Sequence, residues 1–169
     1  MGYKAHCGGD WNSEMPVAYV AAPANQNEKK HFKALATEAK ERFPNARLHV
    51  GDPQYSSGRV RRLIAEDLRG VPVIPKRSGE KVGPGDLYVD KCFRSHGDPE
   101  MCRLYRRRSA CERMNSRAER LVGRVTLRGL GRVEGYVGLA LTLLLLIGVA
   151  SVRRGRPELA RSIEIYACH

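Results

Sequence analysis

The amino-acid sequence predicts an α/β fold. Short runs rich in β-forming apolar residues alternate with segments that repeat apolar residues at helical intervals, in the order β-β-α-β-α-β, followed by two further helices. With 169 residues, of which 42% are hydrophobic, the chain suits one domain with a real core. We expect that domain to span residues 1–152 and residues 153–169 to form a tail.

The first two strands are predicted as a hairpin, because "GYKAHCGGD" alternates in character and "MPVAYVAAP" is apolar and follows a turn. The next segment, "NQNEKKHFKALATEAKERFP", predicts a helix. Asn25 and Glu28 have the spacing of a capping box, apolar residues follow at helical intervals up to Phe43, and Pro44 marks the end.

The middle of the chain continues with "ARLHVGD" as a strand, "SSGRVRRLIAEDLRG" as a helix with a serine cap, and "VPVIP" as a strand. The first two strands are expected to be antiparallel, and the later ones to be joined by crossovers into one mixed sheet with flanking helices. Residues 76–100 are polar and rich in glycine and proline, which predicts a loop within the same domain.

Two helices are predicted at the end of the chain. The first is continuous and rich in arginine, and it places Tyr105, Arg108, Glu112 and Glu119 along one face. The second covers the apolar residues 135–152, which have about the minimum length for a membrane span. We favour a core helix over a span, because the preceding residues predict a soluble α/β unit and arginines at both ends give no orientation.

The charge balance favours a polyanionic partner. There are 30 Lys and Arg residues against 18 Asp and Glu residues, a net charge of +12. Nucleic acid is the first expectation and an anionic membrane surface the second. The five cysteines form no C-x-x-C pair, and the spacing of Cys92, His96, Cys102 and Cys111 matches no common zinc finger. With no signal peptide at Met1, this pattern predicts reduced thiols and a cytoplasmic location.

Two acidic residues are candidates for chemistry, and each has a simpler explanation. Asp52 follows a predicted strand, where α/β folds often build sites, but Gly-Asp-Pro also suits an ordinary turn. Glu112 lies among arginines, where it is either a metal ligand on a rigid helix or the partner of Arg108 in a surface ion pair.

Three segments together resemble the DDE transposases of bacterial and archaeal insertion sequences. They are "GYKAHCGGDWNSEMPVAYVAAPANQNE", "HVGDPQYSSGRVRRLIAEDLRGVPVIPKR" and "YRRRSACERMNSRAERLVGRVTLRGLGRVEGYVGLALTLLLL". In that family the second catalytic aspartate stands in a D-x-x-Y-[DS]-S context, which Asp52, Tyr55, Ser56 and Ser57 match.

The third catalytic residue of the family is the glutamate of a Tyr, Arg, Glu, Lys signature. Tyr105, Arg108 and Glu112 match its first three members, whereas Glu119 stands where the lysine is expected, with Arg120 one step further. In the motif of the second aspartate, the family usually has a glycine beside the tyrosine, and this chain has Gln54 beside Tyr55.

The resemblance implies a ribonuclease-H-like fold in which two aspartates and a glutamate hold two divalent ions, usually magnesium. Asp52 and Glu112 are then the catalytic metal ligands, with magnesium or manganese as cofactor and DNA as partner. A homodimer on the transposon ends is a further expectation. The arginines around Glu112 are expected to bind DNA phosphates; they are Arg106, Arg107, Arg113, Arg117 and Arg120.

The family's first catalytic aspartate lies on a strand before the segment that Tyr3 opens, so the sequence predicts that this first strand is missing and that the chain is a truncated or inactive copy. Asp10 is not a substitute, because it falls in the turn of the predicted hairpin. Two alternatives stay open: a non-catalytic basic DNA-binding protein derived from a transposase, and a single-span membrane protein with a basic soluble part.

Overall fold

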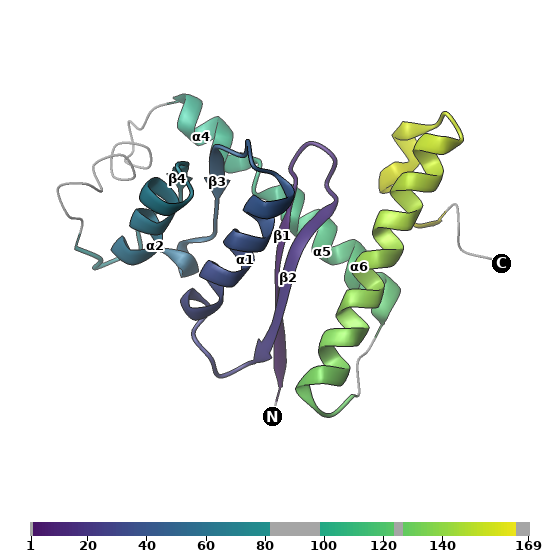
Figure 1. Cartoon of the computed structure of the whole chain (residues 1–169), viewed down its shortest axis with the longest axis horizontal. Helices are drawn as coiled ribbons and strands as arrows, with labels where there is room; N and C mark the ends of the chain where they lie inside the picture. The colour runs from purple at the N-terminus through teal and green to yellow at the C-terminus, as the bar shows by residue number, and fades with distance from the viewer. Residues whose placement is uncertain (1, 82–98, 124–126, 165–169) are drawn as a thin grey trace. The chain divides into compact units, whose positions relative to one another are not determined.

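The computed structural model describes residues 2–81, 99–123 and 127–164. The chain divides into two compact units: Met1–Gln26 with Ala110–His169, and Asn27–Ser109 (Figure 1). Most of the predicted loop at 76–100, with Cys92 and His96, lies outside the described residues. The α/β class is confirmed, because both units combine strands with helices.

The first unit begins with the predicted hairpin. Strands β1 (Tyr3–Gly9) and β2 (Pro16–Pro23) are antiparallel, with Tyr3 opposite Pro23 and Cys7 opposite Tyr19. In the turn, the carboxylate of Asp10 accepts hydrogen bonds from the backbone N–H and the hydroxyl of Ser13, at 2.8 and 2.7 Å. Asp10 therefore has a turn-forming role, as the sequence predicts.

Three helical elements complete this unit: α5 (Ser109–Val122), α6 (Leu130–Arg153) and the 3₁₀ helix η4 (Pro157–Arg161). Helix α6 runs alongside the hairpin in Figure 1 and contacts both β1 and β2. Met114 of α5 and Leu141 and Leu144 of α6 form a buried cluster, against which Cys7 and Tyr19 of the hairpin pack. The unit thus has its own apolar core.

The second unit contains α1 (Lys29–Arg42), β3 (Leu48–Val50), η1 (Pro53–Tyr55), α2 (Gly58–Arg62), the π-helical turn η2 (Leu63–Asp67), β4 (Val71–Val73) and α4 (Pro99–Arg106). Strands β3 and β4 are parallel, with Leu48 opposite Val71, so the predicted crossover through a helix is confirmed. Ile64 and Ile74 are fully buried in a cluster with residues of α1 and α2. A second cluster joins Val73 to Met101 of α4.

Three local predictions differ from the structure. The four described strands form two separate two-stranded sheets instead of one mixed sheet. The capping box at Asn25 and Glu28 is wrong: α1 begins at Lys29, whose N–H bonds to the side chain of Asn27 at 3.0 Å. The arginine-rich segment is two helices, because α4 ends at Arg106 and the chain turns at Arg107 and Arg108, whose N–H groups donate to the carbonyls of Leu104 and Tyr105 three residues back.

Helix α6 confirms the helix predicted at 135–152 and extends it at both ends. Only one face is buried, and the large exposed apolar residues include Leu139, Leu146 and Val152. Among the described residues, α6 is the one helix long and apolar enough to cross a membrane, by length and composition only. A central core helix would be covered on all sides. This expectation is therefore met on the buried face of α6 and is wrong for its exposed face.

Candidate active site

Asp52 follows β3 after the single residue Gly51, where the chain turns into η1. Gly51 lets Ile74 pack closely beside this turn, since a Cβ at that position would lie only 3.1 Å from Cγ1 of Ile74. The Oδ1 atom of Asp52 accepts a hydrogen bond from the N–H of Gln54 at 2.9 Å, and 41% of the side chain is exposed. One carboxylate oxygen of Asp52 therefore has the turn-forming role that Gly-Asp-Pro suggests. The other oxygen, Oδ2, lies near a cation.

That cation is Arg108, whose Nη1 atom lies 3.4 Å from Oδ2 of Asp52. Arg108 follows α4 in the turn, and its guanidinium carbon lies 5.5 Å from the centroid of the Tyr105 ring. Tyr105 in turn packs on the cluster of Val73 and Met101. The second unit thus brings together three residues of the two motifs, Asp52, Tyr105 and Arg108, across 56 positions of sequence.

The residues that follow Asp52 are firmly held. The ring of Tyr55 packs against Phe32 with centroids 5.6 Å apart, and Ser57 caps α2 by accepting from the N–H of Val60 at 3.2 Å. Ser56 is fully buried and donates to Oε2 of Glu80 at 2.6 Å.

Buried Arg61 completes this network, since it binds the hydroxyl of Ser56 and also Oε1 of Glu80, the latter at 2.8 Å. Burial alone would raise the pKa of Glu80, but hydrogen bonds from Ser56 and Arg61 outweigh it and lower the pKa. The network therefore fixes the loop on which Asp52 stands.

Glu112 belongs to the other compact unit and lies in the first turn of α5, where it is exposed. A carboxylate is favourable at this end of a helix because the free N–H groups carry partial positive charge. Among residues 2–81, 99–123 and 127–164, no group of three or more His, Cys, Asp and Glu side chains is arranged to hold a metal ion. The convergence of Asp52 with Glu112 stays a prediction.

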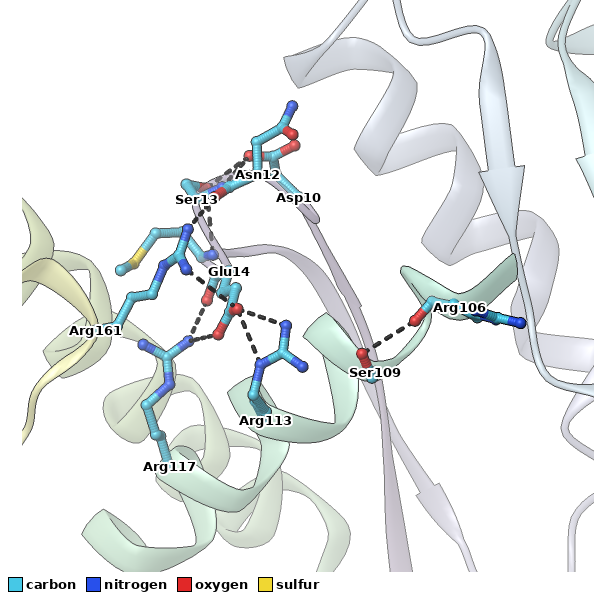
Figure 2. A network of polar contacts seen from close by, with 10 residues as sticks. Asp10, Asn12, Ser13, Glu14, Arg106, Ser109, Arg113, Arg117 and Arg161 are labelled. Carbon is cyan, nitrogen blue, oxygen red and sulfur yellow. Dashed lines mark hydrogen bonds and ion pairs between the residues drawn. The ribbon is translucent and has the colours of Figure 1, made fainter. Parts of the chain in front are cut away.

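The five arginines predicted to bind DNA have different surroundings. Arg106 and Arg107 are exposed at the end of α4. Arg120 pairs with Glu164 at 2.7 Å. Arg113 and Arg117 both contact Glu14 in the hairpin turn of the same unit (Figure 2).

Sequence reasoning missed Glu14, which is only 5% exposed. Its Oε1 accepts from Nε and Nη2 of Arg113 at 2.9 and 2.6 Å. Nη2 of Arg117 lies 3.6 Å from Oε2 and donates to the Glu14 carbonyl at 2.5 Å. Nη1 of Arg161 lies 3.4 Å from Oε1.

Burial by itself would raise the pKa of Glu14, but the hydrogen bonds and charge of Arg113, with the charges of Arg161 and Arg117, lower it. Glu14 therefore stays ionised and ties the hairpin turn to α5, the helix that carries Glu112. No local pattern in "DWNSEMP" pointed to this role, because its partners lie about a hundred residues away.

The carboxylate oxygens of Asp52 and Glu112 are donors of the kind that magnesium prefers, and both side chains reach solvent. In this respect the two residues fit a divalent metal ion. Asp52 would meet it already oriented by Gln54 and Arg108.

Comparison with models of known protein families gives a match. The family described as the transposase DDE domain matches residues 1–146, whereas no curated protein and no solved structure matches. The matched range contains Asp52, Tyr105, Arg108 and Glu112, and it covers far more than half of the 169 residues. The chain therefore belongs to the transposase DDE domain family.

Proposed function

We propose that this chain acts in DNA transposition as part of a catalytic domain that cleaves and joins DNA strands, with Asp52 and Glu112 as ligands of divalent metal ions, magnesium or manganese. The observation that carries the proposal is the gathering of Asp52, Tyr105 and Arg108 from two distant motifs in one compact unit. Family membership supplies the general activity.

The chain's own residues have separable roles in this proposal. Arg108 and the N–H of Gln54 orient the carboxylate of Asp52. Exposed Arg106 and Arg107 meet the DNA phosphates, which makes binding phosphate-directed and only weakly dependent on sequence. When bound, two divalent ions would activate the attacking water or 3′-hydroxyl and stabilise the leaving oxygen.

We also infer a ribonuclease-H-like arrangement, a cytoplasmic location and assembly of two copies on transposon ends. The described strands include an antiparallel pair, β1–β2, and a parallel pair, β3–β4, and a ribonuclease-H-like fold uses both kinds of pairing, although here the two pairs belong to separate sheets. A non-catalytic DNA-binding role is the second candidate, favoured by the net charge of +12.

A nicking assay on supercoiled plasmid with magnesium or manganese tests the proposal. The assay compares a polypeptide of residues 1–169 with a version extended upstream by a strand that bears an aspartate, the third acidic ligand of the family. We expect strong nicking only from the extended polypeptide, because two carboxylates alone do not fix two metal ions.

Within the extended version, Asp52→Asn and Glu112→Gln should each lower the nicking rate at least ~100-fold, because the metal ions lose a ligand that positions them, whereas Asp67→Asn and Glu119→Gln should leave the rate unchanged. Asp67 is an exposed aspartate in the same unit as Asp52, and Glu119 is an exposed glutamate on the same helix as Glu112, so the last two variants are matched controls. Activity that survives both site variants would overturn the assignment, and DNA binding without nicking in any version would favour the second candidate. Strong nicking by residues 1–169 that Glu112→Gln abolishes would show that the third carboxylate is dispensable.

A further inference from the structure

The outer face of α6 carries most of the exposed apolar surface that the structure describes. Among the described residues, the exposed large apolar side chains all lie at positions 127–152, apart from Phe43. No charged residue stands at positions 135–152. The hydroxyl of Thr142 on this face donates to the carbonyl of Gly138 at 2.8 Å, so this polar group is satisfied within the helix. The face therefore favours an apolar partner over water.

The residues of this face have the spacing of helices that pair side by side. They follow one another at intervals of three, four, three and four positions, which is the heptad pattern of a helix pair. We call them the exposed seam: Tyr136, Leu139, Leu143, Leu146 and Ala150. The first four are 37–57% exposed, and Ala150 is half-buried. The seam lies on the side of the helix away from Leu141 and Leu144, which pack in the core of the unit.

The charges at the two ends of the seam select an orientation. The next heptad positions beyond it are Arg132 and Arg153. In a parallel pair each arginine would face the same arginine of the second copy, and the like charges would repel. In an antiparallel pair with Leu143 beside Leu146 of the second copy, Arg153 instead faces Tyr136 of that copy. The face of a tyrosine ring attracts a guanidinium group, and two-fold symmetry makes this contact twice.

The size of the face suits a weak dimer. Helix α6 has 24 residues. Its length is therefore about 36 Å, and a helix with its side chains is about 10 Å across. Pairing along this length would bury on the order of 1,000 Å² in the two copies together, which is near the lower limit for a specific interface. We therefore expect a dissociation constant of ~10–100 µM.

We propose that the exposed seam of α6 binds the same seam of a second copy of this chain, with the two helices antiparallel. As the interface of the two-copy assembly inferred above, the seam rests on the proposed function. The pairing itself uses residues of α6 alone and needs neither DNA nor metal. The hairpin and α5 keep their packing in the dimer, because they contact the other face of α6.

Sedimentation equilibrium of the full chain tests the pairing, at ~1 to ~300 µM and without DNA, metal or detergent. Leu146→Gln should raise the dissociation constant of the dimer at least ~10-fold, because symmetry places two amide groups in the apolar interface. Leu145→Gln makes the same change at the adjacent leucine, which is exposed outside the seam, and should change the constant less than about two-fold. At ~1 µM, where the monomer predominates, both variants should unfold like the wild type.

Arg153→Gln tests the orientation of the two helices. In the antiparallel pair this variant should raise the dissociation constant about two- to five-fold, because the contact with the Tyr136 ring is lost twice. In a parallel pair the same variant would lower the constant, because it removes a repulsion. Arg62→Gln removes an equal charge from an exposed arginine on α2 and should leave the constant unchanged.

Three results overturn the proposal: a chain that stays monomeric throughout the range, equal effects of Leu145→Gln and Leu146→Gln, or tighter pairing of Arg153→Gln. If a monomeric chain instead sediments with vesicles of anionic phospholipid and Leu146→Gln prevents this, the face binds lipid and the proposal is wrong. No cleavage or DNA binding is measured. A dimer that does not nick DNA would therefore contradict only the proposed function, and a monomer that nicks DNA would contradict only the pairing.

Discussion

Glu14 combines two features that destabilise a fold unless other contacts compensate. Its backbone has φ of 57°, in the left-handed region that glycine or asparagine usually occupies, and its carboxylate is largely removed from water. The compensation comes from Arg113, Arg117 and Arg161, which hold the charged form. The contacts of the carboxylate with these arginines explain why a glutamate occupies a position where the backbone conformation favours glycine or asparagine.

This arrangement predicts an acid-sensitive contribution to stability. The folded-state pKa of Glu14 is lowered, so its contribution is fully present above the ordinary glutamate pKa of about 4.3 and is lost as the pH falls through the folded value. Glu14→Gln should therefore cost about 3 kcal/mol of unfolding free energy at pH 7, and the difference from wild type should shrink at pH ~3.

Urea unfolding at the two pH values measures this difference. Asp10 and Glu80 also have lowered pKa values, but they are present in both proteins and cancel in the comparison. A cost that is the same at both pH values would mean that the ionised carboxylate does not stabilise the turn.

At the scale of elements, helix α6 has two apolar faces in unlike surroundings. Leu144 is 1% exposed and packs with Met114 and Leu141, whereas Leu146 is 57% exposed. Both are leucines within the same turn of one helix, so their helical propensities cancel in a comparison. The pair therefore isolates the effect of burial.

Leu144→Ala should lower the unfolding free energy by about 2–5 kcal/mol because it leaves a cavity in the core, and Leu146→Ala should change it by less than about 0.5 kcal/mol. Urea unfolding in detergent-free buffer checks both values. Comparable losses in the two variants would show that the exposed face is also covered in solution.

The break between α4 and α5 is the other finding at this scale. Helical periodicity predicts a continuous helix through Tyr105, Arg108 and Glu112, because each residue there is compatible with a helix. The chain instead turns at Arg107 and Arg108, and this turn lets Arg108 reach Asp52. Tertiary contacts of the second unit thus override local propensity.

For the whole molecule, the two proposed metal ligands belong to different compact units. Asp52 belongs to Asn27–Ser109 and Glu112 to the unit formed by Met1–Gln26 and Ala110–His169, while the family match spans both. A bound ion that both carboxylates share requires them to converge to within a few ångströms of the metal.

Iron-directed cleavage tests this convergence. Ferrous iron bound in place of magnesium should, with ascorbate and peroxide, cut the backbone near both Asp52 and Glu112, as mapped by mass spectrometry. Asp52→Asn should abolish both cuts together, whereas Asp67→Asn should leave both. Cuts near only one of the two residues would refute a shared metal site.

The sequence by itself determined the features that depend on neighbouring residues. These are the β1–β2 hairpin, the crossover from β3 to β4, the serine cap at Ser57 and the transposase family. Alternation, capping and turn chemistry act over a few positions, so they are visible in a single chain.

Only the tertiary structure decided which charges meet and which apolar face is covered. Arg108 pairs with Asp52 across 56 positions, and Arg113 pairs with Glu14 across 99. An arginine is compatible with any nearby carboxylate, and α6 is apolar on all sides, so local patterns do not select among partners. The selection is made by packing, which brings distant residues together and makes burial of an unpaired charge too unfavourable to persist.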